Sequence, residues 1–265
     1  MNDEVYSHGH HQSVTAAHAT RTVASSAAHL EPFLETGMDV LDLGCGPGSI
    51  TAGLADIVAP GSVIGVDSSA DVVAQAAGTY PDRANAVFRE GNVYDLDFGD
   101  ESFDVVHAHQ LLQHLADPVA ALREMRRVVR PGGIVAARDA DFRAMVWHPT
   151  VPELEQWREL YQQLARSNRG EPDAGRRLPA WAAEAGFGEV AVSSSNWVYA
   201  TPEDRRSYAE SWAERVVHSA FAEQTLERGL ADQRTLARLA GGWRRWAQMD
   251  GALFLVPSVE ILARG

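Results

Sequence analysis

The sequence predicts an α/β protein of the Rossmann-like, doubly wound type, with a mostly parallel seven-stranded sheet and helices on both of its faces. Short runs rich in Val, Ile and Leu alternate with helical stretches between residues 38 and 133, which is the pattern of βαβ units with right-handed crossovers. Glycines and prolines mark the ends of these runs. A helical insertion between the last two strands completes the predicted architecture.

Five strands are expected in the first half of the chain. A helical segment, roughly Ser13 to Leu34, precedes them. Asp117-Pro118 looks like an N-cap followed by proline at the first helical position, and Arg130 to Gly133 ends that helix. The predicted strands are Asp39–Leu43, Ser62–Val66, Ala86–Arg89, Phe103–Ala108 and Gly133–Ala137.

The second half is richer in aromatic residues, and all seven tryptophans lie at or beyond Trp147. Thr201-Pro202 opens a helix with a cap, a proline and two acids in its first turn. Apolar residues at helical spacing continue through this helix and a partner helix. The remaining predicted elements are a helix after Thr150, a helix over Leu178–Gly186, a sixth strand over Phe187–Val198 and a final strand over Gly251–Leu262.

The composition limits the classes of function. The 265 residues carry 36 acidic and 23 basic side chains, a formal charge of −13. That balance argues against a nucleic-acid partner, because such binding relies on Lys and Arg contacts to phosphate. The single cysteine, Cys45, permits no intramolecular disulfide and no cysteine-based zinc site. With no signal-like or membrane-length apolar run, we expect a cytoplasmic location and no membrane span.

The strongest single signal is the loop that follows the first strand, where glycine stands at positions 44, 46 and 48. Glycines allow a tight turn and let backbone N–H groups approach a ligand closely. Three polar residues sit at neighbouring strand ends, where open α/β sheets bind ligands. Asp67 is placed to accept hydrogen bonds from a ribose, Asp42 to meet an amine-bearing or cationic ligand, and Asn92 to meet an adenine edge.

These residues resemble those of class I S-adenosylmethionine-dependent methyltransferases, and the subgroup they resemble most is the one of ubiquinone and menaquinone biosynthesis. The resemblance is carried by Val40–Gly48, Asp67, Gly91–Asn92, the Arg130–Gly133 turn, Ser102–Val106 and Leu111–Pro118. It covers about residues 38 to 140 and the sixth-strand region, and it is specific for the cofactor rather than the substrate.

The resemblance implies S-adenosylmethionine as the cofactor. It implies that Gly44, Cys45 and Gly46 contact the methionine part, Asp67 the ribose, and Asn92 with Val93 the adenine. Asn92 departs from the Asp that is frequent in the family. The start Tyr6-Ser7-His8-Gly9-His10-His11 suggests that Tyr6 and His11 close over the cofactor. The full predicted cofactor-binding set is Tyr6, His11, Asp42, Gly44, Cys45, Gly46, Asp67, Ser68, Asn92, Val93 and His109.

On this basis the chain divides into an N-terminal lid or helical segment (1–37), a cofactor-binding methyltransferase domain (38–200 and 249–265) and a helical substrate lid (201–248). Trp147 and Trp197 are candidate pocket residues. The histidines near the N-terminus could instead bind a metal or form a polar tail, but no metal is assigned.

His109, His114 and Asp141 are the candidate catalytic residues. Methyl transfer needs mainly positioning, with a general base when the nucleophile is a hydroxyl or an acidic carbon. His107 and His109 lie on the fourth strand, and we expect only His109 to face the pocket. His114 follows at a helix start, and Asp139 and Asp141 follow the fifth strand.

The predicted activity is methyl transfer to a small-molecule acceptor, an apolar or aromatic metabolite. Two alternatives remain open from the residues. One is an enzyme with the same cofactor and fold that transfers no methyl group, such as a natural-product cyclase. The other is a nicotinamide-dependent dehydrogenase, although its glycines are spaced GxGxxG and those here are spaced GxGxG.

Overall fold

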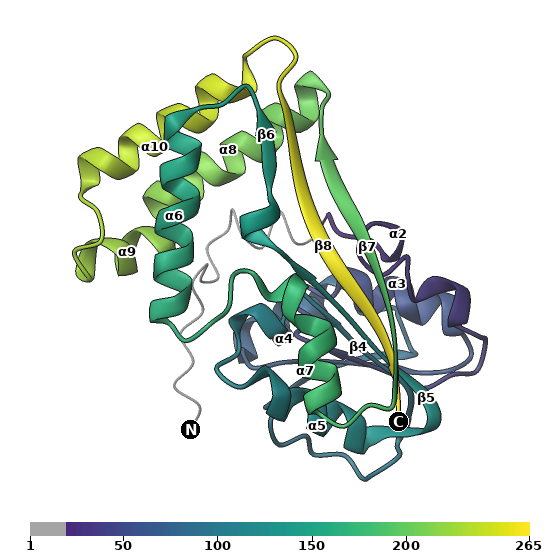
Figure 1. The fold of residues 1–265 in the computed structure, drawn as a ribbon. Coiled ribbons are helices and arrows are strands. Elements are labelled where there is room, and N and C mark those ends of the chain that lie inside the picture. The colour runs from purple at the N-terminus through teal and green to yellow at the C-terminus, as the bar shows by residue number, and fades with distance from the viewer. Residues whose placement is uncertain (1–19) are drawn as a thin grey trace.

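The structure is a computed structural model that describes residues 20–265. Its centre is one sheet, which in this part of the chain has eight strands (Figure 1). The strands are β1 (Val40–Leu43), β2 (Val63–Asp67), β3 (Ala86–Glu90), β4 (Phe103–His109), β5 (Val129–Ala140), β6 (Val146–His148), β7 (Glu189–Tyr199) and β8 (Leu253–Arg264).

The sheet order is β3-β2-β1-β4-β5-β8-β6, with β7 paired to β8. The first five strands run parallel, and β8 is antiparallel to β5, β6 and β7. The strand order reverses direction at β1 and β4, which is the place where such sheets bind ligands. The predicted fold class is confirmed, and among the described strands only the short β6 was not indicated by the sequence.

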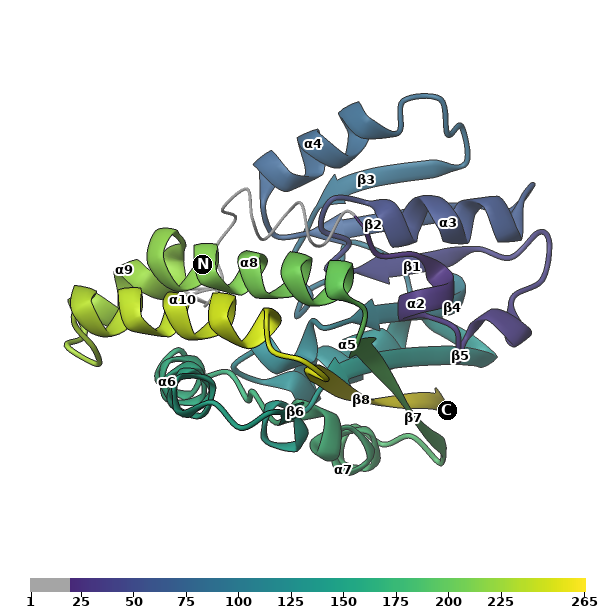
Figure 2. The same cartoon turned by 90° about the horizontal axis from the view of Figure 1, so that it is seen from above.

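Helices cover both faces of the parallel part (Figure 2). The helices α3 (Ser49–Val58) and α4 (Ala70–Thr79) lie on one face, and α5 (Pro118–Val128) and α7 (Leu178–Glu184) lie on the other. One core cluster packs Leu54 and Val58 of α3 against the sheet, and a second packs Leu122 and Met125 of α5 against the opposite face. Asp117 caps α5 by accepting the Ala120 N–H at 2.9 Å, as predicted.

The helical segment expected over 13–34 is shorter within the described residues. Only α2 (Val23–Ser26) and a single 3₁₀ turn, η1 (Glu31–Phe33), are helical there. Val23 and Leu30 are buried in one core cluster with Val40 of β1. Apolar contacts with the sheet, and not a long helix, therefore hold this segment in place. The other 3₁₀ turns are η2 (Leu112–His114), η3 (Phe142–Ala144) and η4 (Ala174–Arg177).

Four helices form a separate layer beyond the sheet: α6 (Pro152–Ser167), α8 (Pro202–His218), α9 (Ala220–Glu227) and α10 (Gln233–Ala247). Thr201 caps α8 by accepting the Asp204 N–H at 3.1 Å, as the sequence indicated. The centre of this layer is aromatic. The ring of Trp157 lies 4.4 Å from that of Trp212 and 4.8 Å from that of Trp243. Most of the tryptophans are therefore core residues of this layer.

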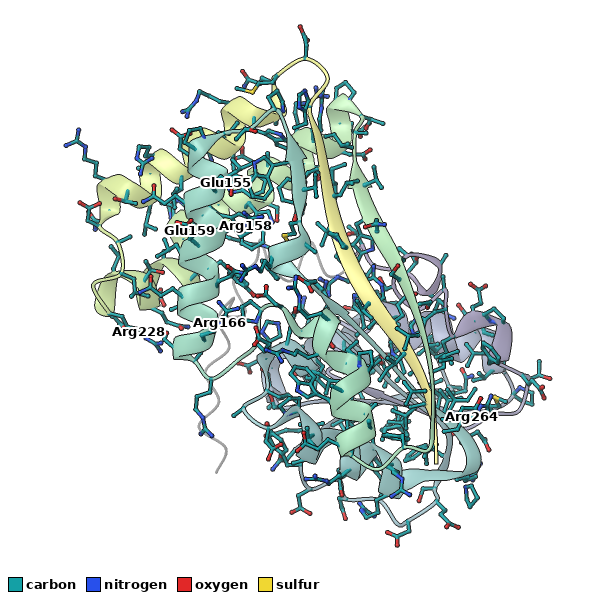
Figure 3. All side chains as sticks on the ribbon, viewed as in Figure 1. Glu155, Arg158, Glu159, Arg166, Arg228 and Arg264 are labelled. Carbon is teal, nitrogen blue, oxygen red and sulfur yellow. The ribbon has the colours of Figure 1, made fainter. Side chains whose placement is uncertain are left out.

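The outer face of α6 is charged (Figure 3). Arg158 donates to Glu155 at 2.6 Å, and Arg166 donates to Asp173 at 2.7 Å. Helix α6 is therefore amphipathic: its charged residues lie on the outer face, and Trp157 and Leu160 are turned inward. No helix within residues 20–265 has the length and apolar character needed to cross a bilayer.

Replacing Trp157 by alanine should lower the free energy of unfolding by about 3–5 kcal/mol, because the change leaves a cavity at the centre of the aromatic layer. Urea denaturation followed by circular dichroism measures this loss. Val217→Ala, at an exposed position of α8, is the control and should change stability by less than about 0.5 kcal/mol. Equal losses for the two variants would contradict this account of the layer.

Candidate functional site

The glycine loop after β1 adopts a conformation that only glycine tolerates well. Gly44, Gly46 and Gly48 have φ values of +67°, +53° and +84°. The loop is tied to the next strand because the N–H groups of Gly44 and Cys45 donate to the Val66 carbonyl at 2.8 and 3.0 Å. A Cβ atom added at Gly46 would meet no atom within 4 Å, so this part of the backbone faces open space.

Asp67, at the end of β2, turns toward the glycine loop. One carboxylate oxygen accepts the Gly46 N–H at 3.0 Å, and the other accepts the Ser69 N–H at 3.1 Å. Each oxygen of a carboxylate can accept about two hydrogen bonds. Both oxygens therefore keep acceptor capacity for a ligand.

Asp42 has its donors within the protein. It is buried, and it accepts hydrogen bonds from the Thr51 hydroxyl at 2.6 Å and pairs with Nδ1 of His107 at 2.7 Å. Asp42 therefore does not depend on a ligand for a donor, and the prediction that it meets an amine-bearing or cationic ligand stays a prediction. With these two partners, Asp42 forms part of a fixed polar floor beneath the loop.

A small cleft opens above this floor. It is lined by Arg21, Asp42, Gly44, Cys45, Gly46, Pro47, Ser49, Ile50 and His109. Five predicted site residues therefore meet here: Asp42, Gly44, Cys45, Gly46 and His109. Burial, followed by the charges of Asp42 and Asp67, raises the pKa of the Cys45 thiol, so Cys45 lines the cleft as a neutral side chain.

His107 and His109 differ in depth rather than in the face of β4 that carries them. Residues two apart on a strand share a face, so both side chains lie on the same face of β4. His107 is fully buried against Asp42, whereas His109 lines the cleft. The expectation that His109 faces the pocket is confirmed, and the ring of His109 lies 5.7 Å from that of Trp197.

The predicted adenine side of the site is more open. Asn92 is exposed, and its side-chain oxygen accepts the Tyr94 N–H at 3.0 Å. This bond forms a turn, which leaves the amide N–H₂ as the group of Asn92 for a ligand. Val93 is half-buried and Ser68 is exposed. Asp67, Ser68, Asn92 and Val93 are not among the lining residues of the small cleft.

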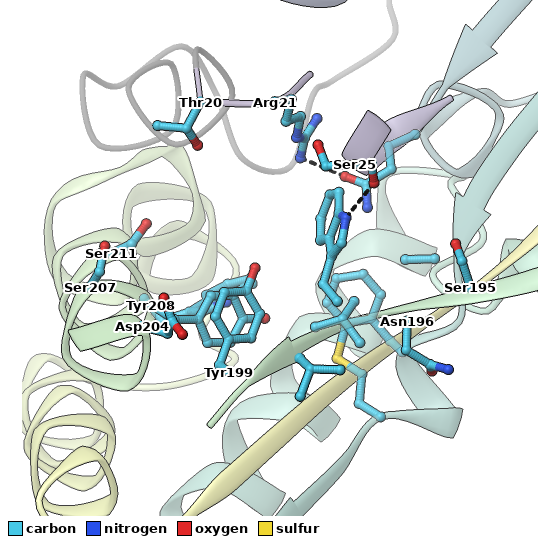
Figure 4. Close-up of a pocket in the computed structure, with 18 of the residues that line it drawn as sticks. Thr20, Arg21, Ser25, Ser195, Asn196, Tyr199, Asp204, Ser207, Tyr208 and Ser211 are labelled. Carbon is cyan, nitrogen blue, oxygen red and sulfur yellow. Dashed lines mark hydrogen bonds between the residues drawn. The ribbon is translucent and has the colours of Figure 1, made fainter. Parts of the chain in front are cut away.

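A larger cavity of about 1140 Å³ shares the lining residue Arg21 with the cleft. Figure 4 shows side chains that line this cavity. Its walls come from the N-terminal segment, the ends of β4 and β5, strand β7 and one face of α8. Arg21 lines both spaces. In Figure 4, dashed lines mark the hydrogen bond that Arg21 donates to Gln110 and the one that Trp197 donates to the Ser25 carbonyl. The side chains of Ser207 and Ser211 lie on the α8 side.

Trp197 joins several walls of the cavity. Its indole N–H donates to the Ser25 carbonyl at 2.8 Å. The guanidinium groups of Arg21 and Arg138 lie 5.2 and 4.8 Å from its ring centroid, distances typical of cation–π contacts. The prediction that Trp197 lines the pocket is confirmed. Trp147 does not line either space, because it stacks on Phe254 with the ring centroids 5.4 Å apart.

Arg138 also belongs to a buried ion pair. It donates to Glu260 at 3.2 Å and to Ser195 at 3.1 Å, and Glu260 accepts hydrogen bonds from Ser193 and Ser195. Glu260 and Ser195 line the cavity. A buried charge is costly unless it is paired. The network of Arg138, Glu260 and the two serines therefore gives the cavity a fixed polar wall on its β7–β8 side.

Of the two other candidate catalytic residues, only His114 faces the cavity. It lies in η2, and burial, followed by the charge of Arg21, lowers its pKa to about 3. Asp141 accepts two hydrogen bonds from Arg176, at 2.5 and 2.7 Å, and caps η3 through Ala144. The assignment of Asp141 as a catalytic residue was wrong, because it is buried in this structural ion pair and lines neither space.

Several site residues were not foreseen. Arg21 and Gln110 belong to no motif that the sequence shows, and Gln113 lies in the Leu111–Pro118 motif but was given no role; only the folded chain brings all three to the site. Arg21 donates to the Gln110 side chain at 2.7 Å. Tyr6, His8, His10 and His11 lie outside the described residues, so the predictions about them stay predictions. Within residues 20–265, no group of three His, Cys, Asp or Glu side chains has the arrangement to hold a metal ion.

The comparisons with known proteins agree with this geometry. A family model described as "Methyltransferase domain" matches residues 34–203. An uncharacterised methyltransferase of Schizosaccharomyces pombe is 34% identical over 269 residues, which cover 97% of this chain and 95% of that protein. The chain belongs to the class I S-adenosylmethionine-dependent methyltransferases.

One further relative of this methyltransferase matches over about half of each sequence. The demethylmenaquinone methyltransferase of Lactococcus lactis is 38% identical over 129 residues, 48% of this chain and 49% of that protein. A phosphoethanolamine N-methyltransferase of Haemonchus contortus, solved with S-adenosylhomocysteine, has a TM-score of 0.56 at 22% identity, covering 90% of this chain and 51% of that one. The cyclase SpnF has a TM-score of 0.54 at 23% identity, covering 95% and 80%. These two structures share the fold.

The methyltransferase uses S-adenosylmethionine, and the residues of the cleft fit this cofactor. The open space beside Gly46 admits a ligand against the loop backbone, and Asp67 keeps acceptor capacity at the end of the next strand. The neighbouring Cys45 thiol is neutral and brings no negative charge of its own. The family also argues against the dehydrogenase alternative.

The stability of the folded protein should depend on pH through the buried carboxyl group of Asp139. Burial raises the pKa of this carboxyl to about 7. In the unfolded chain Asp139 loses its proton near pH 4, so between about pH 4 and 7 the folded state holds more protons and its stability falls as pH rises. Asp139→Asn should therefore raise the melting temperature at pH 8 and change it little at pH 4.

Differential scanning calorimetry at the two pH values measures this effect. Asp71→Asn, an exposed acid in the first turn of α4, is the control and should show no such gain. An Asp139→Asn variant that loses stability at pH 8 would contradict the assignment.

Proposed function

We propose that this methyltransferase transfers the methyl group of S-adenosylmethionine to a small-molecule acceptor bound in the 1140 Å³ cavity. The observation that carries the proposal is the position of Arg21, which lines both the cofactor cleft and the larger cavity. The two spaces therefore meet at one point. A cofactor in the cleft would present its reactive end to a molecule in the cavity.

The residues in the cleft and at the neighbouring ends of β2 and β3 have the following proposed roles. The loop at Gly44, Cys45 and Gly46 binds the methionine part through its backbone. Asp67 accepts hydrogen bonds from the ribose hydroxyls, with Ser68 beside it. Asn92 and Val93 contact the adenine, Asn92 through its free amide N–H₂ group. These roles agree with the orientation of Asp67 toward the loop and with the Asx turn at Asn92.

Methyl transfer requires the protein to position the two reactants and to exclude water from them. When bound, the cofactor supplies a methyl group on a positively charged sulfur, which makes the methyl carbon electrophilic. Arg21 and Trp197 close the wall between the N-terminal segment and β7, which limits access of water to the junction. His109 faces the cofactor, and His114 faces the acceptor as a neutral ring. Orientation of this kind contributes much of the rate in group transfer.

A small molecule fits the cavity better than a nucleic acid. The lining includes Asp204, Glu210, Glu214 and Glu260, and the chain carries a formal charge of −13. Both features disfavour a phosphate backbone. The aromatic side chains on the lining, among them Trp197, Tyr199 and Tyr208, favour an acceptor with an apolar or aromatic body.

The helices of segment 201–248 form part of the proposed substrate lid. Strand β7 and helix α8 meet there, because the ring of Tyr199 stacks on that of Tyr208 at 3.8 Å. Helix α6, from the 38–200 segment, packs into the same aromatic layer, so the lid draws on both segments.

Binding of S-adenosylhomocysteine tests the cofactor site. Asp67→Ala should weaken binding at least tenfold, because it removes the proposed hydrogen bonds to the ribose, and bonds to charged groups contribute about 1.5–3 kcal/mol each. Isothermal titration calorimetry measures the dissociation constant. Asp71→Ala removes the same charge nearby and should leave it unchanged. Equal affinities for wild type and Asp67→Ala would contradict the site.

Transfer of a labelled methyl group distinguishes the proposed activity from the cyclase alternative, which the fold of SpnF keeps open. The purified full chain is incubated with methyl-labelled S-adenosylmethionine and a small-metabolite extract of cells that carry the gene. We expect label in an extractable product of low molecular mass. Products that change while no label moves would support the cyclase, and label in macromolecules would contradict a small-molecule acceptor.

A further inference from the structure

One buried polar atom on the cavity lining has no use in the roles described above. Gln113 lines the cavity and is only 4% exposed. Its side-chain Nε2 lies 3.1 Å from Nε2 of His114, whereas its Oε1 has no hydrogen-bond partner among residues 20–265. A buried acceptor left unpaired costs about 1–3 kcal/mol. Such an atom in a ligand cavity therefore indicates a group that the ligand supplies.

The backbone of Gln113 is held firmly from two sides. Its N–H donates to Asp139 at 3.1 Å, and its carbonyl accepts the Glu171 N–H at 2.9 Å. A Cβ atom added at Gly170 would approach this carbonyl to 2.7 Å, so the loop that carries Glu171 packs directly on Gln113. These long-range contacts fix where the side chain begins, which is what a residue that orients a ligand requires.

In the structure the amide nitrogen of Gln113, and not its oxygen, points to the neighbouring His114. Burial keeps the imidazole neutral, with a pKa of about 3. A neutral ring offers one donor and one acceptor nitrogen. With the Gln113 amide N–H₂ directed to Nε2 of His114, that nitrogen accepts, and the carboxamide oxygen is left for a ligand.

The position of Gln113 along the chain places it near the reacting end of the cofactor. His109 lines the cofactor cleft, Gln110 binds Arg21 at the junction, and Gln113 lines the acceptor cavity. The segment 109–114 thus runs from one space into the other. A ligand group that contacts Gln113 from the cavity therefore lies near the place where the cavity meets the cofactor cleft.

We infer that the Gln113 carboxamide oxygen binds the O–H or N–H of the methyl acceptor, so that the acceptor is a hydroxyl- or amino-bearing metabolite methylated at that oxygen or nitrogen. This inference rests on the proposed function. The acceptor's lone pair forms the new C–O or C–N bond as the S–C bond of the cofactor breaks, and the electron pair of that bond stays on sulfur. The acceptor's proton is released to water. Gln113 holds the hydrogen and thereby directs the lone pair toward the methyl carbon.

The test combines product analysis with three variants. The labelled product formed from the extract is purified, and nuclear magnetic resonance identifies the atom that carries the new methyl group. Its rate of formation is then compared for wild type, Gln113→Met, Gln113→Glu and Gln75→Met. Methionine keeps the shape of glutamine without the oxygen, glutamate keeps an oxygen at the same place, and Gln75 is an exposed residue of α4.

The methyl group should be found on oxygen or nitrogen. Gln113→Met should lower kcat about 10- to 100-fold, the effect of one lost buried hydrogen bond, with an unchanged dissociation constant for S-adenosylhomocysteine and an unchanged melting temperature. Gln113→Glu should retain more activity than Gln113→Met, and Gln75→Met should match wild type.

A methyl group on carbon or sulfur would overturn the inference and leave the proposed function standing. So would full activity of Gln113→Met. Absence of any labelled product, with S-adenosylhomocysteine still bound, would overturn the proposed function and this inference with it.

Discussion

The hydrogen bond from the Gly46 N–H to the Asp67 carboxylate joins the two features on which the site depends. The glycine loop needs three positive φ angles, and this bond, together with those to the Val66 carbonyl, holds the loop against the neighbouring strand. The same bond turns Asp67 toward the cleft instead of toward solvent. Beneath it, the buried Asp42–His107 pair fixes the floor. The cofactor site is thus largely formed by local backbone geometry and by strand order.

The acceptor side is built differently. Its walls come from the N-terminal segment, β7 and α8, which are far apart in the sequence and meet around Trp197. The aromatic layer of α6, α8 and α10 supports this wall from behind, and its tryptophans pack mainly against one another. This separation of a local cofactor site from a long-range acceptor site fits a family in which one cofactor serves many acceptors.

The contrast between a cofactor site built from local segments and an acceptor site built from distant ones also explains what could be predicted from the sequence. The seven predicted strands, the glycine loop and the caps at Asp117 and Thr201 follow from periodicity and local turn chemistry, and they were confirmed. The pairing of Asp42 with His107 and the ion pair of Asp141 with Arg176 were missed, because the partners lie 65 and 35 residues away. Gln113 was passed over in favour of its neighbour His114, since nothing in a sequence shows which amide oxygen will be buried without a partner.

The cofactor site proposed for this methyltransferase joins the ends of β1, β2 and β4. A crystal structure of the full chain with S-adenosylhomocysteine would show whether these strand ends hold the cofactor. We expect an adenosyl group whose two ribose hydroxyls lie within hydrogen-bond distance of Asp67, with the sulfur between His109 and the large cavity. A ribose bound away from Asp67, or a sulfur that does not face the cavity, would contradict it.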